Sequence, residues 1–174
     1  VVLSAGGTLV VGTGGLTING ALNLSTGTTL DLGANDLAGT GSIDNAGVIR
    51  LEGGNTVPAN LWDTNSGEVI YDGAGTNLIA SRDYHDLTIE GTQTTNGSFT
   101  VYNTLTISGG ATLTNSGTDT VTVRGNWTNN VGAGGYSDAG GTVNFSGTKT
   151  TTLSGATSFN DLTISGAGKT VEFD

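Results

Sequence analysis

The residues best suited to acid–base chemistry lie together in one short stretch, RDYHD, the most charge-rich pentapeptide of the chain. It contains the only histidine, His85, which the carboxylate of Asp83 or Asp86 could orient as a general base. A later segment of similar sequence has Ser158 and Asn160 in place of Asp83 and His85. Since this position accepts either His or Asn, we expect a solvated corner without catalysis, where His85 is a candidate ligand contact.

Trp62 is the second candidate contact residue. It lies in the segment PANLWDTNSG, which holds the only proline, Pro58, and Trp62 has no counterpart in the later segment. We expect this irregular segment to loop out of the body, because proline is tolerated where no ladder hydrogen bond is needed. An exposed tryptophan there would be available to a ligand such as a surface glycan.

Metal binding is a separate question, because eleven aspartates lie along the chain, ten of them near turns. Calcium prefers oxygen ligands of this kind. However, the repeated G-x-D spacing of calcium-loaded β-helices is absent, and aspartate is common in turns for conformational reasons alone. We expect no cofactor and no required metal, and incidental calcium binding stays open.

Composition and charge exclude several classes of partner. The 174 residues carry a net charge of −10, with only five Lys and Arg, which argues against nucleic acid and against anionic membranes. There is no cysteine for a disulfide scaffold or a thiol–metal site, and no apolar run long enough for a membrane span. Glycine is abundant, at 31 residues, so a broad globular core is not expected, whereas a narrow core between many short strands is.

The elements that must position these residues are short strands. Apolar residues alternate with polar ones, the period of a strand with one buried face, and no helix signal is present. Leu9, Leu30 and Leu51 are spaced by 21 residues, as are Leu16 and Leu37. Three strands in 21 residues correspond to one coil of a three-sided β-solenoid. We predict an all-β fold, a right-handed parallel β-helix of about eight or nine coils, with glycines at the corners.

An internal repeat supports this prediction, because Gly67–Gly91 and Gly141–Gly166 follow the same pattern of strands and glycine turns. Wider matching gives two units, roughly 16–91 and 99–166, with a third copy beginning near 170, all within one solenoid domain spanning 1–174. The apolar residues shared by the copies are the predicted structural core: Val69, Tyr71, Leu87, Ile89, Val143, Phe145, Phe159, Leu162 and Ile164.

Three phrases carry a resemblance to a known family: GNWTNN at 125–130, GTVNFSG at 141–147 and FNDLTI at 159–164. In this order they resemble the repeats of large bacterial surface proteins, the β-strand-repeat and filamentous-haemagglutinin-like β-helical adhesins. The resemblance implies a secreted or cell-surface adhesin or filament repeat region, without catalysis in the repeats. A recognisable N-terminal secretion domain of the two-partner type is absent from these 174 residues.

The predicted function is therefore that of an extracellular stalk or spacer segment of a large surface adhesin. We see no capping helix at either end, so we expect the end coils to contact further coils of the same chain or identical subunits. A self-assembling filament subunit is one alternative. A glycan-binding or polysaccharide-cleaving β-helix is another, although the few basic residues are too dispersed for the Lys or Arg base that lyases need beside clustered acids.

Overall fold

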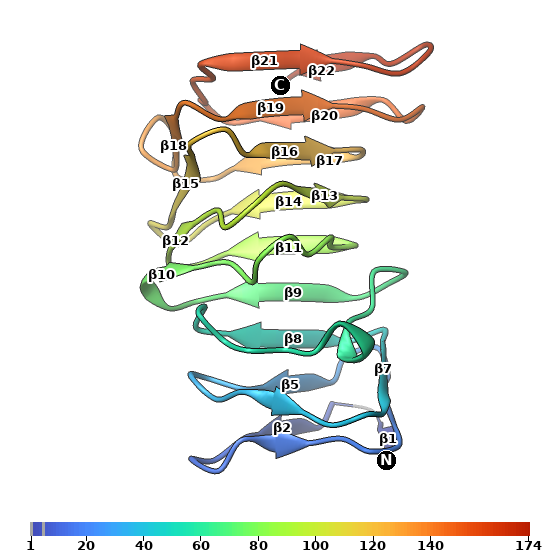
Figure 1. Cartoon of the computed structure of the whole chain (residues 1–174). Helices are drawn as coiled ribbons and strands as arrows, with labels where there is room; N and C mark the ends of the chain where they lie inside the picture. The colour runs from blue at the N-terminus through green and yellow to red at the C-terminus, as the bar shows by residue number, and fades with distance from the viewer. Residues whose placement is uncertain (1, 5) are drawn as a thin grey trace.

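The computed structural model describes residues 2–4 and 6–174, and they form a right-handed parallel β-solenoid of about eight coils (Figure 1). Every pairing between named strands is parallel and joins strands of neighbouring coils, as the sequence predicts. The only helical turn among the described residues is η1 (Ala59–Leu61), a short 3-10 helix. None of these residues lies in a helix long and apolar enough to cross a membrane.

One side of the solenoid is a single nine-stranded sheet, which we call the continuous face. It runs the length of the molecule from bottom to top of Figure 1. Its strands in spatial order are β2 (Thr8–Val10), β5 (Thr29–Asp31), β8 (Val48–Leu51), β9 (Glu68–Tyr71), β11 (Asp86–Ile89), β14 (Thr104–Ile107), β17 (Asn126–Asn129), β20 (Thr151–Ser154) and β22 (Val171–Phe173).

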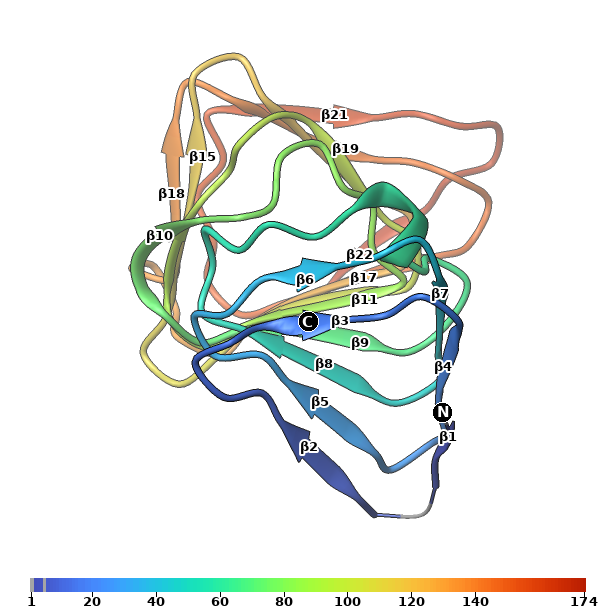
Figure 2. The same ribbon diagram turned by 60° about the horizontal axis from the view of Figure 1, so that its bottom comes forward.

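The other two sides, the interrupted faces, break where residues 52–67 form no strand. Before the break lie β1 (Val2–Leu3), β4 (Ala21–Leu24) and β7 (Ser42–Asn45) on one side, and β3 (Leu16–Thr17) and β6 (Leu37–Ala38) on the other. After it lie β10 (Ala74–Asn77), β12 (Thr92–Thr94), β15 (Thr112–Ser116) and β18 (Tyr136–Ala139), and β13 (Phe99–Val101), β16 (Thr120–Val123), β19 (Thr142–Phe145) and β21 (Asp161–Ile164). Figure 2 shows the three sides nearly end-on.

The 21-residue period holds in the first coils and then fails. Leu9 pairs with Leu30, and Leu16 with Leu37, as the sequence predicts. Leu30, however, pairs with Ile49 rather than with Leu51, because the next coil is two residues shorter. A fixed period read from the first coils therefore cannot be extended through the chain.

Glycine permits close approach of successive coils at their corners. A Cβ atom on Gly41 would collide with the backbone of Gly20 in the preceding coil, and one on Gly125 would collide with the carbonyl of Asn103. Only glycine allows the two backbones to approach this closely, so these corners require it.

The core is one continuous cluster of apolar side chains inside the coils. Six of the nine predicted core residues are buried there: Val69, Tyr71, Leu87, Ile89, Val143 and Phe145. Phe159 is half-buried and packs against the cluster. The prediction is wrong for Leu162 and Ile164, which are 41% and 53% exposed. Both lie on β21, the last strand of its sheet, and no described strand covers it.

The two copies of the repeat lie on different sides of the solenoid. Val69 and Leu87 belong to β9 and β11 on the continuous face, but their matches Val143 and Leu162 belong to β19 and β21 on an interrupted face. The repeated pattern is thus displaced by one side of the triangle. Similar strands serve any side, because each needs only alternating inward and outward residues.

Candidate functional site

Of the two candidate contact residues, Trp62 lies within the irregular segment 52–67 and His85 directly precedes β11 of the continuous face. Thr64, Asn65, His85 and Tyr102 line an open hollow of about 360 Å³, which we call the His85 hollow. Its walls come from the irregular segment, from the residue preceding β11 and from the turn after β13. Segments far apart in sequence meet here because successive coils stack at the same corner.

His85 is held by its neighbour, because its Nδ1 lies 2.8 Å from Oδ2 of Asp86. The other carboxylate oxygen of Asp86 accepts hydrogen bonds from the Asn103 side chain, at 2.8 Å, and from the Thr104 backbone N–H, at 2.9 Å. Asp86 therefore joins His85 to the next coil. The histidine is fixed at the rim of the hollow, where its ring can hydrogen-bond a polar ligand.

Trp62 is half-buried, so the expectation of an exposed tryptophan is wrong. Its ring contacts Tyr84 edge-to-face, with centroids 5.5 Å apart, and its indole N–H donates to the backbone oxygen of Asp83 at 2.7 Å. The segment around it packs onto the core through the buried Leu61 instead of looping away. A ligand-contact role for Trp62 stays a prediction, restricted to the part of the ring that reaches solvent.

Beneath this corner two tyrosine hydroxyls meet in the core. The oxygens of Tyr71 and Tyr84 are 3.1 Å apart, and the Ile79 N–H donates to Tyr71 at 3.3 Å. Burial raises the pKa of Tyr71 to about 12 and raises the pKa of Tyr84 well above its ordinary value of 10. Both phenols are therefore neutral at physiological pH, where the pair can share a hydrogen bond without a buried charge.

A second open hollow, the Arg82 groove, lies on the adjacent interrupted face beside β10. It measures about 450 Å³, and its walls include Asn55, Val57, Asn77, Ile79, Arg82 and Asn96. Arg82 is not among the residues predicted from the sequence, because the chemistry expected of RDYHD centres on His85. The signal was present, since Arg82 is one of only five basic residues in an acidic chain.

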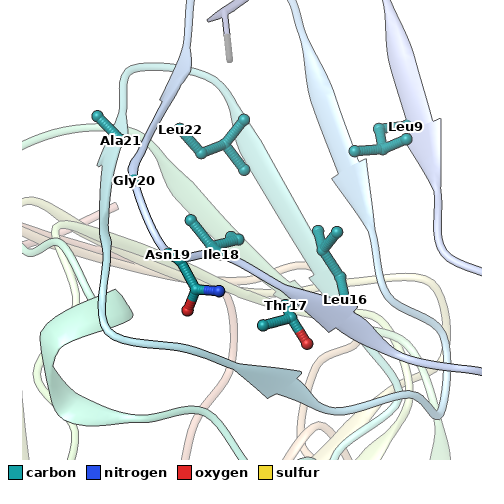
Figure 3. Close-up of a pocket in the computed structure, with 8 residues that line it drawn as sticks. All are labelled: Leu9, Leu16, Thr17, Ile18, Asn19, Gly20, Ala21 and Leu22. Carbon is teal, nitrogen blue, oxygen red and sulfur yellow. The ribbon is translucent and has the colours of Figure 1, made fainter.

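Figure 3 shows a third hollow, of about 270 Å³, at the first coil. Leu9, Leu16, Ile18 and Leu22 line it, and they are the inward side chains of that coil. This hollow continues the apolar interior of the solenoid, and we assign it no ligand.

Within the described part of the chain, no three His, Asp or Glu side chains come close enough to hold a metal ion. The His85–Asp86 pair and the Arg82 groove are the arrangements that could recognise a polar ligand. Comparisons with protein-family models, with curated proteins and with solved structures found no match for this chain.

Proposed function

We propose that this chain is a structural segment, a stalk or spacer of a large secreted or cell-surface protein. The observation that carries the proposal is the continuous face, in which nine parallel strands are hydrogen-bonded in sequence over one apolar core. At the usual strand spacing these nine strands span roughly 40 Å. A body of this kind sets a fixed distance between whatever is attached to its two ends.

The core supports this role because nearly all the buried apolar residues that the structure describes form one cluster. Buried side chains of one cluster extend from Ile18 in the first coil to Leu153 in β20. Each coil buries its apolar residues against its neighbours, so separating any two coils would expose apolar surface. A pulling force along the axis must then break a ladder and open the core together.

The chain contains no cysteine, which makes a direct mechanical test simple. Cysteines introduced at the exposed positions Thr13 and Ser158 would attach handles near the two ends for single-molecule pulling. We expect the distance between the handles to stay constant until the chain unfolds in one cooperative event. Gradual extension at low force, with residues 52–67 yielding first, would contradict the spacer role.

Self-assembly is the second candidate, and one observation favours it. Leu162 and Ile164 on β21 and Phe173 on β22 are exposed, at 41%, 53% and 73%. A second copy stacked on these strands would cover them and extend the parallel ladders. Electron microscopy of the purified 174-residue chain distinguishes the candidates: fibres of stacked subunits support assembly, and single short rods support the spacer.

A further inference from the structure

Arg82 is held in the Arg82 groove by an unusual backbone conformation. The preceding residue, Ser81, has φ of 49°, the only positive φ at a non-glycine position among the described residues. Its N–H donates to the Asn96 oxygen at 3.1 Å, which ties this turn to the next coil. Strained residues of this kind persist where the surroundings fix them, and they concentrate at ligand sites.

The charge of Arg82 has no counter-ion among the described residues. Its Nη2 donates to the Val57 oxygen at 3.2 Å, and its Nε is buried without a partner. The neighbouring carboxylate of Asp83 makes no ion pair with Arg82 in the described structure and instead accepts hydrogen bonds from the Thr100 N–H at 2.7 Å and from the Tyr102 hydroxyl at 3.3 Å. Most of the five N–H donors of this guanidinium therefore have no partner among the described residues.

Arg50 shows how unusual this is in so acidic a chain. The Arg50 guanidinium pairs with Asp72 at 2.8 Å and with Glu90 at 2.6 Å. With a net charge of −10, carboxylates are plentiful, yet the structure describes none within ion-pair distance of Arg82. An external anion would supply the missing partner, and the planar fork of arginine fits a carboxylate or a sulfate.

The remaining walls of the groove indicate the kind of molecule that would carry this anion. The side-chain amides of Asn77 and Asn96 are exposed and make no hydrogen bond within the described structure, so they can bind hydroxyl groups. Ile79 and Val57 add apolar surface between these polar groups. An acidic sugar matches these three features of the groove, since it has an anionic group for Arg82, hydroxyls for the two amides and an apolar ring face for Ile79 and Val57.

We propose that the Arg82 groove binds an acidic glycan, with Arg82 pairing to its anionic group and Asn77 and Asn96 binding its ring hydroxyls. The open volume of about 450 Å³ suits one or two sugar units. Arg82 is the specificity residue, because it selects acidic over neutral sugars. Binding at this groove is independent of the spacer role, which rests on the continuous face.

Isotope-labelled protein titrated with three disaccharides tests the proposal by NMR: one with a uronate carboxylate, one with a sulfate ester and one neutral. We expect an acidic disaccharide to shift the amide signals of Asn77, Ile79 and Asn96, and the neutral one to leave them unchanged. The carboxylate and sulfate titrations distinguish the two anionic groups. Binding should weaken as salt is added, because the ion pair is accessible to solvent.

Arg82→Gln should reduce the affinity by about tenfold or more, because one charged hydrogen-bonded pair is lost. Arg82→Lys keeps the charge without the fork and should give an intermediate affinity. Arg124→Gln is the matched control, since Arg124 lies over the Tyr102 ring, 4.8 Å from its centroid, and does not line the groove. The Arg124→Gln variant should bind the acidic disaccharide with the affinity of the unsubstituted chain.

Three results would overturn the proposal: equal shifts with the neutral disaccharide, no shifts with either acidic one, or unchanged affinity in folded Arg82→Gln. Circular dichroism establishes that each variant is folded. If Arg82→Gln does not fold, the test rests on the unsubstituted chain: the amide signals that shift in its titration show which residues contact the disaccharide. Shifts at Thr64 and Tyr102 instead would place binding at the His85 hollow and contradict the assignment.

Discussion

The continuous face and the interrupted faces respond differently to the same irregular sequence. Residues 52–67 replace strands on two sides of the solenoid, yet β8 and β9 pair in register across them through Val48–Glu68 and Leu51–Tyr71. On the continuous face, the distance in sequence between paired residues varies from 18, for Leu87 and Leu105, to 26, for Trp127 and Leu153. One uninterrupted sheet is enough to keep the coils stacked, while corners and interrupted faces accommodate the differences in length.

The interiors of the two halves differ as well. The first coils are filled by Leu and Ile, whereas the later ones contain an aromatic cluster in which Trp127 contacts Tyr136, Phe145 and Phe159 edge-to-face. Edge-to-face rings add to the stabilisation by apolar burial. Larger side chains therefore fill the later coils, and the greatest single contributions to stability should come from them.

Trp127→Ala should have the largest effect, because the indole is fully buried on β17 of the continuous face. We expect the free energy of unfolding to fall by about 3–5 kcal/mol. The outward neighbour Thr128→Ala is the control, with an expected change within about 0.5 kcal/mol. Urea denaturation measures both, and a Trp127→Ala change below 1 kcal/mol would show that the aromatic cluster is not central to the core.

A matched pair of leucines compares the two kinds of face directly. Leu105 on the continuous face and Leu61 in η1 are both fully buried. Each change to alanine should cost about 2–5 kcal/mol, and Leu105→Ala should cost more because a strand paired on both sides cannot collapse around the cavity. Equal or reversed costs in denaturation would mean that the interrupted segment is as rigid as the sheet.

High pH should weaken the corner beneath the His85 hollow. Burial raises the folded-state pKa of Tyr71 to about 12, so the folded chain holds this proton more tightly than the unfolded chain. The contribution of the protonated Tyr71 hydroxyl to the free energy of unfolding is complete below pH 10. It is lost as the pH rises from 10 towards 12, at a rate of up to about 1.4 kcal/mol per pH unit.

Urea midpoints measured between pH 8 and 11.5 test this expectation. Tyr71→Phe should show a smaller decline, whereas Tyr102→Phe, at the surface hollow, should keep the full one. An identical decline in the unsubstituted chain and in both variants would show that the loss of stability at high pH does not come from the buried tyrosine pair.

Arg50→Gln should have the smallest effect, although Arg50 links three coils on the outside of the continuous face through Asp72 and Glu90. All three side chains are about a third exposed, so water and salt screen the ion pairs. We expect a loss of less than about 1 kcal/mol, and still less at high salt. A loss above 2 kcal/mol would mean that the coils depend on this network as well as on the core.

The sequence predicted the coil architecture because it rests on a local signal, the alternation of apolar and polar residues at pairs such as Val143 and Phe145. It did not predict which side a strand joins, because that depends on the summed lengths of preceding corners; the copies at Val69 and Val143 differ for this reason. The sequence also did not predict that Trp62 is half-buried, because its burial depends on Tyr84 in the next coil. Arg82 was missed because the missing counter-ion is a property of three-dimensional neighbours.

We infer that the continuous face joins the two halves into one body, and hydrogen exchange of its amides tests this inference. The Glu68 and Asp72 N–H groups bond to Gly47 and Leu51 beside the interruption, at 3.0 and 2.9 Å, and the Asn126 N–H bonds to Asn103 at 2.8 Å far from it. We predict similar protection for all three amides, limited by unfolding of the whole chain. Much faster exchange at Glu68 and Asp72 would show that the molecule opens into two halves and would contradict the account.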